Sequence, residues 1–280
     1  MIYKTIDIKV DYEKMGVDNG GYQPTMTLYL PDNTPEIDTE RKRPTVLICP
    51  GGAYGRTSDR EAEPVALKFA AEDCNAIVVR YSCAPSRFPS QLLELSYAVA
   101  MVRENAEEWN IDTDKIVVAG FSAGGHLAAS FGMFWNKDFV KEYFGYKGGE
   151  NKPNGMILGY PVITSGEYAH RYSFELLLGE KANDAEMLEL VSLEKQVSED
   201  TPRAFIWHTN EDGSVPAENS YLLAAAMKEK GIRSEMHIFP NGWHGLSLCN
   251  DTVFGPGQYK GQFDECQAWF NMAVRWLKNL

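Results

Sequence analysis

The chain has 280 residues, of which 44% are hydrophobic and 24% charged, and these ordinary proportions exclude global disorder. Its 27 Lys and Arg against 39 Asp and Glu give a net charge of −12, which repels nucleic acid and anionic membrane surfaces. No apolar run approaches the roughly 20 residues of a membrane span, and Met1–Met15 lacks the apolar core of a signal peptide. We therefore expect one α/β domain over residues 1–280, located in the cytoplasm, with no nucleic-acid or membrane partner.

The sequence predicts neither a metal nor a cofactor. It has no H-E-x-x-H, no Walker loop and no G-x-G-x-x-G after a strand. The number of cysteines is odd, they are scattered, and they include no C-x-x-C pair, so we expect reduced thiols and not a disulfide framework or a zinc site. They are Cys49, Cys74, Cys83, Cys249 and Cys266.

Short β-rich runs alternate with longer helical patterns along the chain. The first two strands flank the turn signal Asn19-Gly20-Gly21, as in an antiparallel pair, and the alternation in the last strand suits a sheet edge. The alternation predicts a doubly wound, mostly parallel sheet with helices on both faces. The predicted strands are Thr5–Val10, Thr25–Leu30, Thr45–Cys49, Ala76–Tyr81, Ile116–Phe121, Gly155–Leu158, Ala204–His208 and Ser234–Phe239. The predicted helices are Glu61–Ala71, Leu92–Val102, Ala123–Phe134, Ala217–Lys230 and Asp264–Leu280.

Two segments interrupt this alternation. Residues 136–153 are aromatic, basic and Gly-rich, and residues 164–200 carry an acidic helical pattern around Ala182–Leu193. Both follow strands, where an α/β sheet places the loops that form its site. We expect them to form a small cap within the single domain.

Gly120-Phe121-Ser122-Ala123-Gly124 has the pattern G-x-S-x-G. It follows the strongest buried-strand pattern in the chain, and a helical pattern opens at Ala123. This context predicts a nucleophile elbow, with Ser122 on a sharp turn. The helix N-terminus would present the N–H of Ala123 where an oxyanion develops. A glycine-rich turn that binds nothing is the alternative.

A serine hydroxyl needs a general base at neutral pH. His244 lies in the Gly-flanked loop Asn241–Gly245, after the last predicted strand and before the C-terminal helix, where a base is expected in this kind of sheet. It is therefore the predicted base. The other histidines are expected to be packed or solvated side chains, and they are His126, His170, His208 and His237.

The acid of the triad should follow Ser122 and precede His244 in the chain. Asp212 fills that position in the loop after the strand Ala204–His208, and the neighbouring Glu211 is its competitor. The following Gly213 and Val215-Pro216 turn favour Asp212, because a tight loop can aim one side chain at the site.

A second oxyanion donor is expected from the glycine-rich turn Cys49–Gly55, which follows a predicted strand. Gly52 or Ala53 would donate its N–H, and the small side chains would let the backbone approach a substrate carbonyl. A tight turn without a ligand is the alternative.

Four motifs in this order resemble the α/β-hydrolase superfamily, within its esterase/lipase-like group of acetyl xylan esterases, feruloyl esterases and sugar-hydrolase-like proteins. They are Cys49–Tyr54 (CPGGAY), Gly120–Ala129 (GFSAGGHLAA), Ile206–Pro216 (IWHTNEDGSVP) and Trp243–Gly245 (WHG). One departure is that Pro50 and Ala53 replace the first His and the third Gly of the H-G-G-G that opens the oxyanion loop of lipase-type relatives. This argues against the hormone-sensitive-lipase branch and leaves the carbohydrate-esterase branch.

The resemblance implies a serine esterase with Ser122 as nucleophile, His244 as base and Asp212 as acid. Aryl formamides, peptides or general carboxylic esters are alternative substrates for the same triad. A hydrolase-fold protein that binds without catalysis is a third interpretation. The sequence leaves the oligomeric state open, and a homo-oligomer is compatible with it.

The resemblance to carbohydrate esterases implies that acetylated sugars, such as xylo-oligosaccharides, are the substrates. Tyr54 adjoins the oxyanion loop and Trp243 precedes the base, so these rings are expected to wall a short acyl pocket. Trp135 and Tyr143 offer faces for sugar rings, although packing within the cap accounts for them equally well. The negative net charge favours a neutral substrate.

Overall fold

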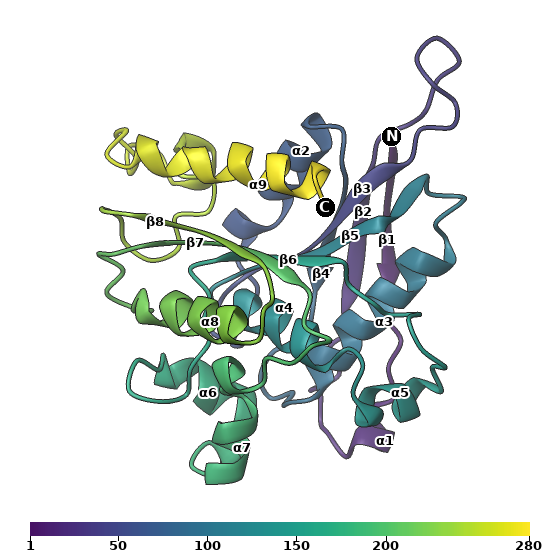
Figure 1. Ribbon diagram of the computed structural model, residues 1–280. Helices are drawn as coiled ribbons and strands as arrows, with labels where there is room; N and C mark the ends of the chain where they lie inside the picture. The colour runs from purple at the N-terminus through teal and green to yellow at the C-terminus, as the bar shows by residue number, and fades with distance from the viewer.

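The computed structural model describes residues 1–280 and contains one eight-stranded sheet in the order β1-β2-β4-β3-β5-β6-β7-β8 (Figure 1). β2 pairs antiparallel with β1 and β4, and all other neighbours are parallel. This confirms the predicted sheet, its antiparallel opening and β8 as an edge strand. The strands are β1 (Ile2–Asp7), β2 (Thr25–Leu30), β3 (Arg43–Cys49), β4 (Asn75–Arg80), β5 (Ile111–Phe121), β6 (Gly155–Gly159), β7 (Arg203–Thr209) and β8 (Ser234–Phe239).

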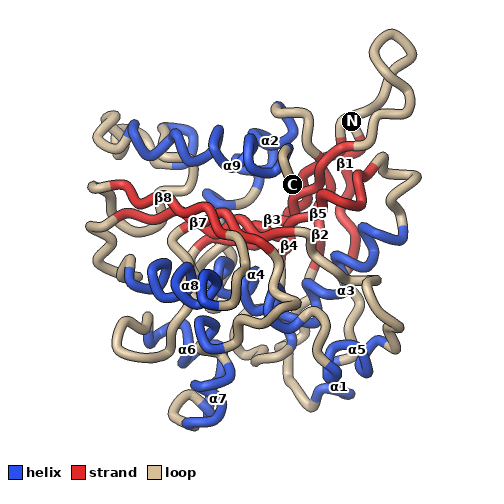
Figure 2. The backbone as a smooth tube through the Cα atoms, in the orientation of Figure 1, coloured by secondary structure: helices blue, strands red, loops and turns tan.

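Helices cover both faces of the sheet, as Figure 2 shows, with α2 and α9 on one face and α3, α4 and α8 on the other. None of the helices is both long and apolar enough to span a bilayer. The helices are α1 (Tyr12–Met15), α2 (Glu63–Ala71), α3 (Ser90–Glu104), α4 (Ala123–Phe134), α5 (Asp138–Phe144), α6 (Arg171–Leu178), α7 (Ala185–Leu190), α8 (Glu218–Glu229) and α9 (Ala268–Lys278). Short 3-10 turns lie at Asp59–Glu61, Gly179–Lys181, Leu193–Lys195, Asp251–Val253 and Asp264–Gln267.

The sheet separates two hydrophobic cores. In β3, Leu47 points into the core under α3, α4 and α8, whereas Val46 and Ile48 point into the core under α2 and α9. A strand buried on both faces needs apolar residues at every position, which is why the central strands read as unbroken apolar runs. The edge strand β1 is almost wholly exposed and starts three residues before the predicted strand, because no apolar pattern marks its ends.

The two predicted cap segments lie in different places. Within 136–153, α5 lies beside α1 (Figure 1), and Tyr143 Oη donates to the carbonyl of Asp11 over 3.0 Å. The indole N–H of Trp135 donates to the carbonyl of Asp200 over 2.9 Å, so both side chains join separate segments of the chain. Segment 164–200 carries α6 and α7 and lies along the edge of the sheet where β5, β6 and β7 end (Figure 1).

Candidate active site

Ser122 lies on a strained turn between β5 and α4. Its φ of 55° and ψ of −121° are disfavoured for a residue with a side chain. The turn is held because the N–H of Ser122 donates to Gly159 O over 3.0 Å and its carbonyl accepts from Val162 N over 3.1 Å. A Cβ on Gly120 would lie 2.0 Å from Gly124 O, and one on Gly124 would lie 2.1 Å from a neighbouring carbonyl. The G-x-S-x-G pattern is therefore a steric requirement of this turn.

The three residues predicted as a triad form one chain of hydrogen bonds. Ser122 follows β5, Asp212 follows β7 and His244 follows β8, so the parallel strands bring them to the same edge of the sheet. His244 Nε2 lies 2.7 Å from Ser122 Oγ, and His244 Nδ1 lies 2.7 Å from Asp212 Oδ2. Asp212 Oδ1 accepts the N–H groups of Ser214 and Val215 over 3.0 and 2.9 Å. This geometry can activate a serine hydroxyl.

The competitor Glu211 does not contact His244. Its side chain Oε2 accepts the N–H of Gly242 at 3.4 Å and makes no hydrogen bond or ion pair with the imidazole. The structure thus separates the two adjacent carboxylates and brings only Asp212 to the imidazole.

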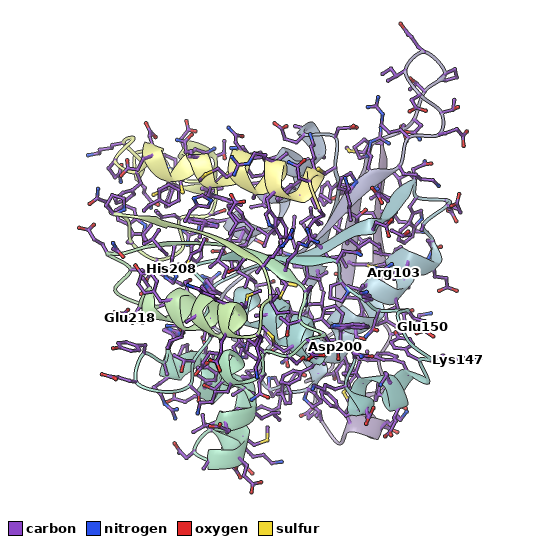
Figure 3. The ribbon with its side chains drawn as sticks, viewed as in Figure 1. Arg103, Lys147, Glu150, Asp200, His208 and Glu218 are labelled. Carbon is purple, nitrogen blue, oxygen red and sulfur yellow. The ribbon has the colours of Figure 1, made fainter.

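His208, labelled in Figure 3, lies near the end of β7 and was predicted only as a packed residue. It also contacts Asp212. Its Nε2 lies 2.9 Å from Val215 O and 3.3 Å from Asp212 Oδ2, while its Nδ1 lies 2.8 Å from Ser220 Oγ. Both groups near Nε2 are acceptors, which assigns the proton to Nε2. The signal in the sequence is a histidine four residues before the acid.

The charge of Asp212 is stabilised by its two histidine neighbours. Burial by itself raises the pKa of a carboxyl group, but the hydrogen bonds from His208 and His244 outweigh it. They hold the pKa of Asp212 well below its ordinary value. A carboxylate that stays ionised can orient the imidazole and stabilise an imidazolium.

The predicted oxyanion residues lie beside Ser122. Gly52 and Ala53 line the same cavity as Ser122, and their N–H groups donate to no acceptor within the protein. Gly52 has a φ of 132°, and a Cβ there would lie 2.3 Å from Arg56 O, so only glycine fits. Ala123 is the first residue of α4, and its N–H therefore has no partner one helical turn earlier. These N–H groups are available for an oxyanion.

Glu61 connects the oxyanion loop to the loop of the base, a role that the sequence did not reveal. Its carboxylate is buried, with Oε2 accepting the N–H of Gly51 over 2.8 Å and Oε1 accepting Tyr160 Oη–H over 2.7 Å. Tyr160 Oη in turn accepts the N–H of Ser247 over 2.9 Å, and its ring lies 5.1 Å from that of His244. The two loops that must face each other across the ester are thereby joined.

A cavity of about 330 Å³ opens over Ser122 and His244. Its lining is mostly polar and contains no long aliphatic side chain. A larger cavity of about 740 Å³ lies beside α2, but it contains no residue of the triad. No group of three or more His, Cys, Asp or Glu side chains is arranged to hold a metal ion. The catalytic cavity is lined by Gly52, Ala53, Arg56, Ser58, Arg60, Glu61, Ser122, His170, Tyr172, Ser214, His244 and Gly245.

The structure does not place Tyr54 and Trp243 in this lining, contrary to the expectation from their positions in the sequence. The Tyr54 ring is only 2% exposed, and its Oη lies 2.8 Å from Nδ1 of the buried His126. Trp243 turns outward and packs edge-on against Phe254 and Phe263. Sequence adjacency to a catalytic residue does not fix side-chain direction, because consecutive residues of a loop point different ways.

Segment 164–200 supplies two cavity residues that the sequence did not single out. His170 was expected to be solvated, but it is half-buried in the cavity, with Nδ1 2.8 Å from Ser173 Oγ. Its burial, followed by the proximity of His244, lowers its pKa. Tyr172 is 58% exposed at the same cavity. Segment 136–153 supplies no residue to it.

Comparison with known families and sequences gives a consistent group of relatives. The BD-FAE family model matches residues 26–227, which include Ser122 and Asp212. The chain is 40% identical over 240 residues to endo-1,4-beta-xylanase B of Butyrivibrio fibrisolvens, covering 84% of this chain and 36% of that protein. It is 29% identical over 236 residues to an acetylxylan esterase of Xylanibacter ruminicola, covering 82% and 45%. The chain thus spans between about a third and about three fifths of the length of the curated relatives it matches.

Solved structures match over nearly the whole chain. An acetyl ester-xyloside bifunctional hydrolase of Caldicellulosiruptor lactoaceticus is 33% identical with a TM-score of 0.82, covering 99% of this chain and 96% of that one. A carboxylesterase of Lactobacillus plantarum WCFS1 is 26% identical with a TM-score of 0.85, covering 100% and 98%. The fold described above is therefore shared with ester hydrolases.

Proposed function

Because the chain belongs to the BD-FAE family and has the α/β-hydrolase fold, we propose that it is a serine esterase that removes short acyl groups, acetyl above all, from sugars. The observation that carries the proposal is the chain of two 2.7 Å contacts from Ser122 Oγ through His244 to Asp212, at the floor of an open cavity. The comparisons support ester hydrolysis, and the geometry supplies the groups that would perform it.

In the proposed reaction, Ser122 Oγ attacks the ester carbonyl carbon while its proton passes to His244 Nε2. The N–H groups of Ala123 and of Gly52 or Ala53 stabilise the oxyanion that forms. The intermediate expels the alcohol, which takes the proton from His244, and leaves an acyl-enzyme on Ser122. A water molecule then gives a proton to His244 and attacks the acyl carbon. As the acid leaves, His244 returns the proton to Ser122 Oγ and the free enzyme is restored.

A short acyl group and a sugar alcohol fit the cavity better than a lipid. A volume of about 330 Å³ is at the lower end for ligand cavities, and no row of aliphatic side chains extends from it to hold a long chain. Its polar lining can hydrogen-bond hydroxyl groups, and the exposed ring of Tyr172 can stack on a sugar face. Relatives described as acetylxylan esterase and acetyl ester-xyloside hydrolase support the same substrate class.

The test compares acetyl and octanoyl esters of one alcohol, and then acetate release from acetylated xylo-oligosaccharides. We expect faster cleavage of the acetyl ester and release of acetate from the sugar, both lost in Ser122→Ala. A faster octanoyl rate without acetate from the sugar would indicate a lipase-like esterase instead. An aryl formamide belongs in the same panel, since preferential cleavage of it would move the substrate class to amides.

A further inference from the structure

Two arginine side chains without an ion-pair or hydrogen-bond partner line the cavity over Ser122. Arg56 and Arg60 lie between β3 and α2, in the same connection as Gly52 and Ala53, and both are exposed. Neither guanidinium takes part in an ion pair or a hydrogen bond within the protein. A protein with a net charge of −12 has many carboxylates available to neutralise such cations. Unpaired cations at this cavity are therefore available to a ligand.

The other arginines show that pairing is the rule in this chain. Arg41, Arg43, Arg80 and Arg275 each bind a carboxylate. Arg87, Arg103 and Arg171 donate to backbone carbonyls. Only Arg203 and Arg233 are likewise unpartnered, and they lie at the beginnings of β7 and β8, at the opposite edge of the sheet from the triad.

The two cavity arginines border the two halves of the catalytic apparatus. Arg60 Nη2 would lie 3.2 Å from a Cβ on Gly245, the residue after the base, and the guanidinium lies 5.7 Å from the centroid of the Phe254 ring. Arg56 Cγ would lie 3.0 Å from a Cβ on Gly52 in the oxyanion loop. The guanidinium of Arg60 therefore lies close to the loop of His244, and the aliphatic part of Arg56 lies against the oxyanion loop.

The acidic groups of the site do not neutralise these cations. Both oxygens of Glu61 accept protons from inward-facing donors, the N–H of Gly51 and the hydroxyl of Tyr160. Asp212 is bound to His244 and to backbone N–H groups. No carboxylate of the protein lies within 4.0 Å of either guanidinium, so the N–H groups of both are free to bind a carboxylate of a ligand.

We propose that Arg56 and Arg60 select ester substrates that carry a carboxylate, such as an acetylated sugar that bears an acid group. A guanidinium can donate two parallel N–H hydrogen bonds, one to each oxygen of a carboxylate. The inference rests on the proposed esterase function and narrows its substrate class. It replaces the expectation of a neutral substrate, which followed from the net charge, because the cavity itself presents two arginines that no carboxylate pairs.

The experiment measures kcat/KM on matched pairs of esters. In the first pair, acetylated methyl glucuronoside and acetylated methyl glucoside differ by a carboxylate on the alcohol side. In the second, the hydrogen succinate and butyrate esters of methyl glucoside differ by a carboxylate on the acyl side. We expect a preference of about tenfold for the charged member of at least one pair, declining as ionic strength rises. The pair that shows it identifies which side of the ester carries the acid.

Three variants test the assignment to the arginines. Arg60→Gln and Arg56→Gln should each reduce the preference ratio several-fold, and the double variant should abolish it. Arg233→Gln removes the same charge from an unpartnered arginine at the opposite edge of the sheet, and it should leave the ratio unchanged. A ratio that Arg233→Gln alters as much as Arg60→Gln would reduce the effect to net charge and overturn the proposal.

The remaining outcomes separate this inference from the proposed function. Equal kcat/KM on both members of both pairs, with the neutral esters hydrolysed, would overturn the carboxylate selection and leave the esterase assignment intact. Failure to hydrolyse any of the four esters would overturn the proposed function and this inference with it.

Discussion

Two buried carboxylates in this protein differ in their partners and therefore in their charge. Asp212, at the catalytic edge, is 5% exposed and binds His208 and His244. Glu94 on α3 is fully buried and accepts only neutral donors, the hydroxyl of Tyr12 and the N–H and hydroxyl of Ser82. Burial raises the pKa of Glu94 from 4.5 to about 7, whereas the imidazoles reverse that effect at Asp212.

The two groups contribute to stability in opposite pH ranges. The lowered pKa of Asp212 gives a contribution that is present above its ordinary value and is lost as pH falls. The raised pKa of Glu94 gives one that is present at acid pH and is lost as pH rises towards 7. The partners of a buried carboxylate, and not burial alone, thus decide whether it is ionised. Changes at the catalytic edge should alter rate, and changes at Glu94 should alter stability.

The largest expected effect comes from removing the nucleophile at the catalytic edge. Ser122→Ala should lower turnover by about 10⁶-fold, as removal of a triad serine does elsewhere, while the unfolding temperature stays close to that of the parent protein. A fluorophosphonate probe should label Ser122 in the parent and nothing in the variant. Labelling of another residue, or retained activity, would show that the catalytic edge has been assigned wrongly.

The next effect concerns the two adjacent carboxylates after β7. Asp212→Asn should lower kcat by about 10⁴-fold, because the amide cannot stabilise an imidazolium and favours the wrong tautomer of His244. Glu211→Gln is the matched control and should change kcat little, since Glu211 does not contact the base. The reverse order of effects would transfer the role of the acid to Glu211.

A smaller effect is expected at Glu61, a third buried carboxylate. Glutamine has one acceptor oxygen and cannot serve both Gly51 N–H and Tyr160 O–H, so Glu61→Gln should loosen the oxyanion loop. The loss of one buried hydrogen bond, about 1–3 kcal/mol, corresponds to a fall in kcat of roughly tenfold to a hundredfold.

The readout that distinguishes positioning from stability at Glu61 is the split between kcat and KM. We expect Glu61→Gln to lower kcat with little change in KM. Glu63 is an exposed residue nearby, and the control variant Glu63→Gln should leave both constants unchanged. A Glu61→Gln protein that unfolds more easily but turns over at the parent rate would restrict Glu61 to a structural role.

The sequence was sufficient for the sheet and for the positions of the triad because both depend on local patterns. Ser122, Asp212 and His244 each follow a strand, and parallel strands end at one edge. The predicted oxyanion residues were found for the same reason. The triad and oxyanion roles themselves remain predictions until the experiments above are done.

The walls of the cavity could not be predicted in this way, because they depend on how separate segments pack. Tyr54 is adjacent to the oxyanion loop in sequence, yet its ring turns into the core towards His126. Tyr172 is distant in sequence and reaches the cavity through the placement of α6. Likewise, the contact of His208 with Asp212 requires the turn after β7 to fold back, and a single histidine in a strand gives no indication of this.

Substitution of Glu94 is expected to have the smallest effect on activity. It should change only the stability of the protein, in contrast to substitution of Asp212. Between pH 4.5 and about 7 the unfolded chain has an ionised Glu94 and the folded protein a protonated one, so the free energy of unfolding should fall as pH rises. One proton corresponds to at most about 1.4 kcal/mol per pH unit. Glu94→Gln should lose this slope, measured by denaturant unfolding across the range, while kcat changes less than about twofold.

The slope, and not the absolute stability, is the decisive quantity for Glu94. Glutamine would turn an N–H₂ group towards one of the donors Tyr12 or Ser82, which lowers stability at every pH without adding a pH dependence. Glu104→Gln at the exposed end of α3 is the matched control and should retain the parent slope. If Glu94→Gln also retains the parent slope, Glu94 is ionised in the folded protein. Neutral donors would then keep a buried carboxylate ionised as well as imidazoles do, and Glu94 and Asp212 would not differ in charge.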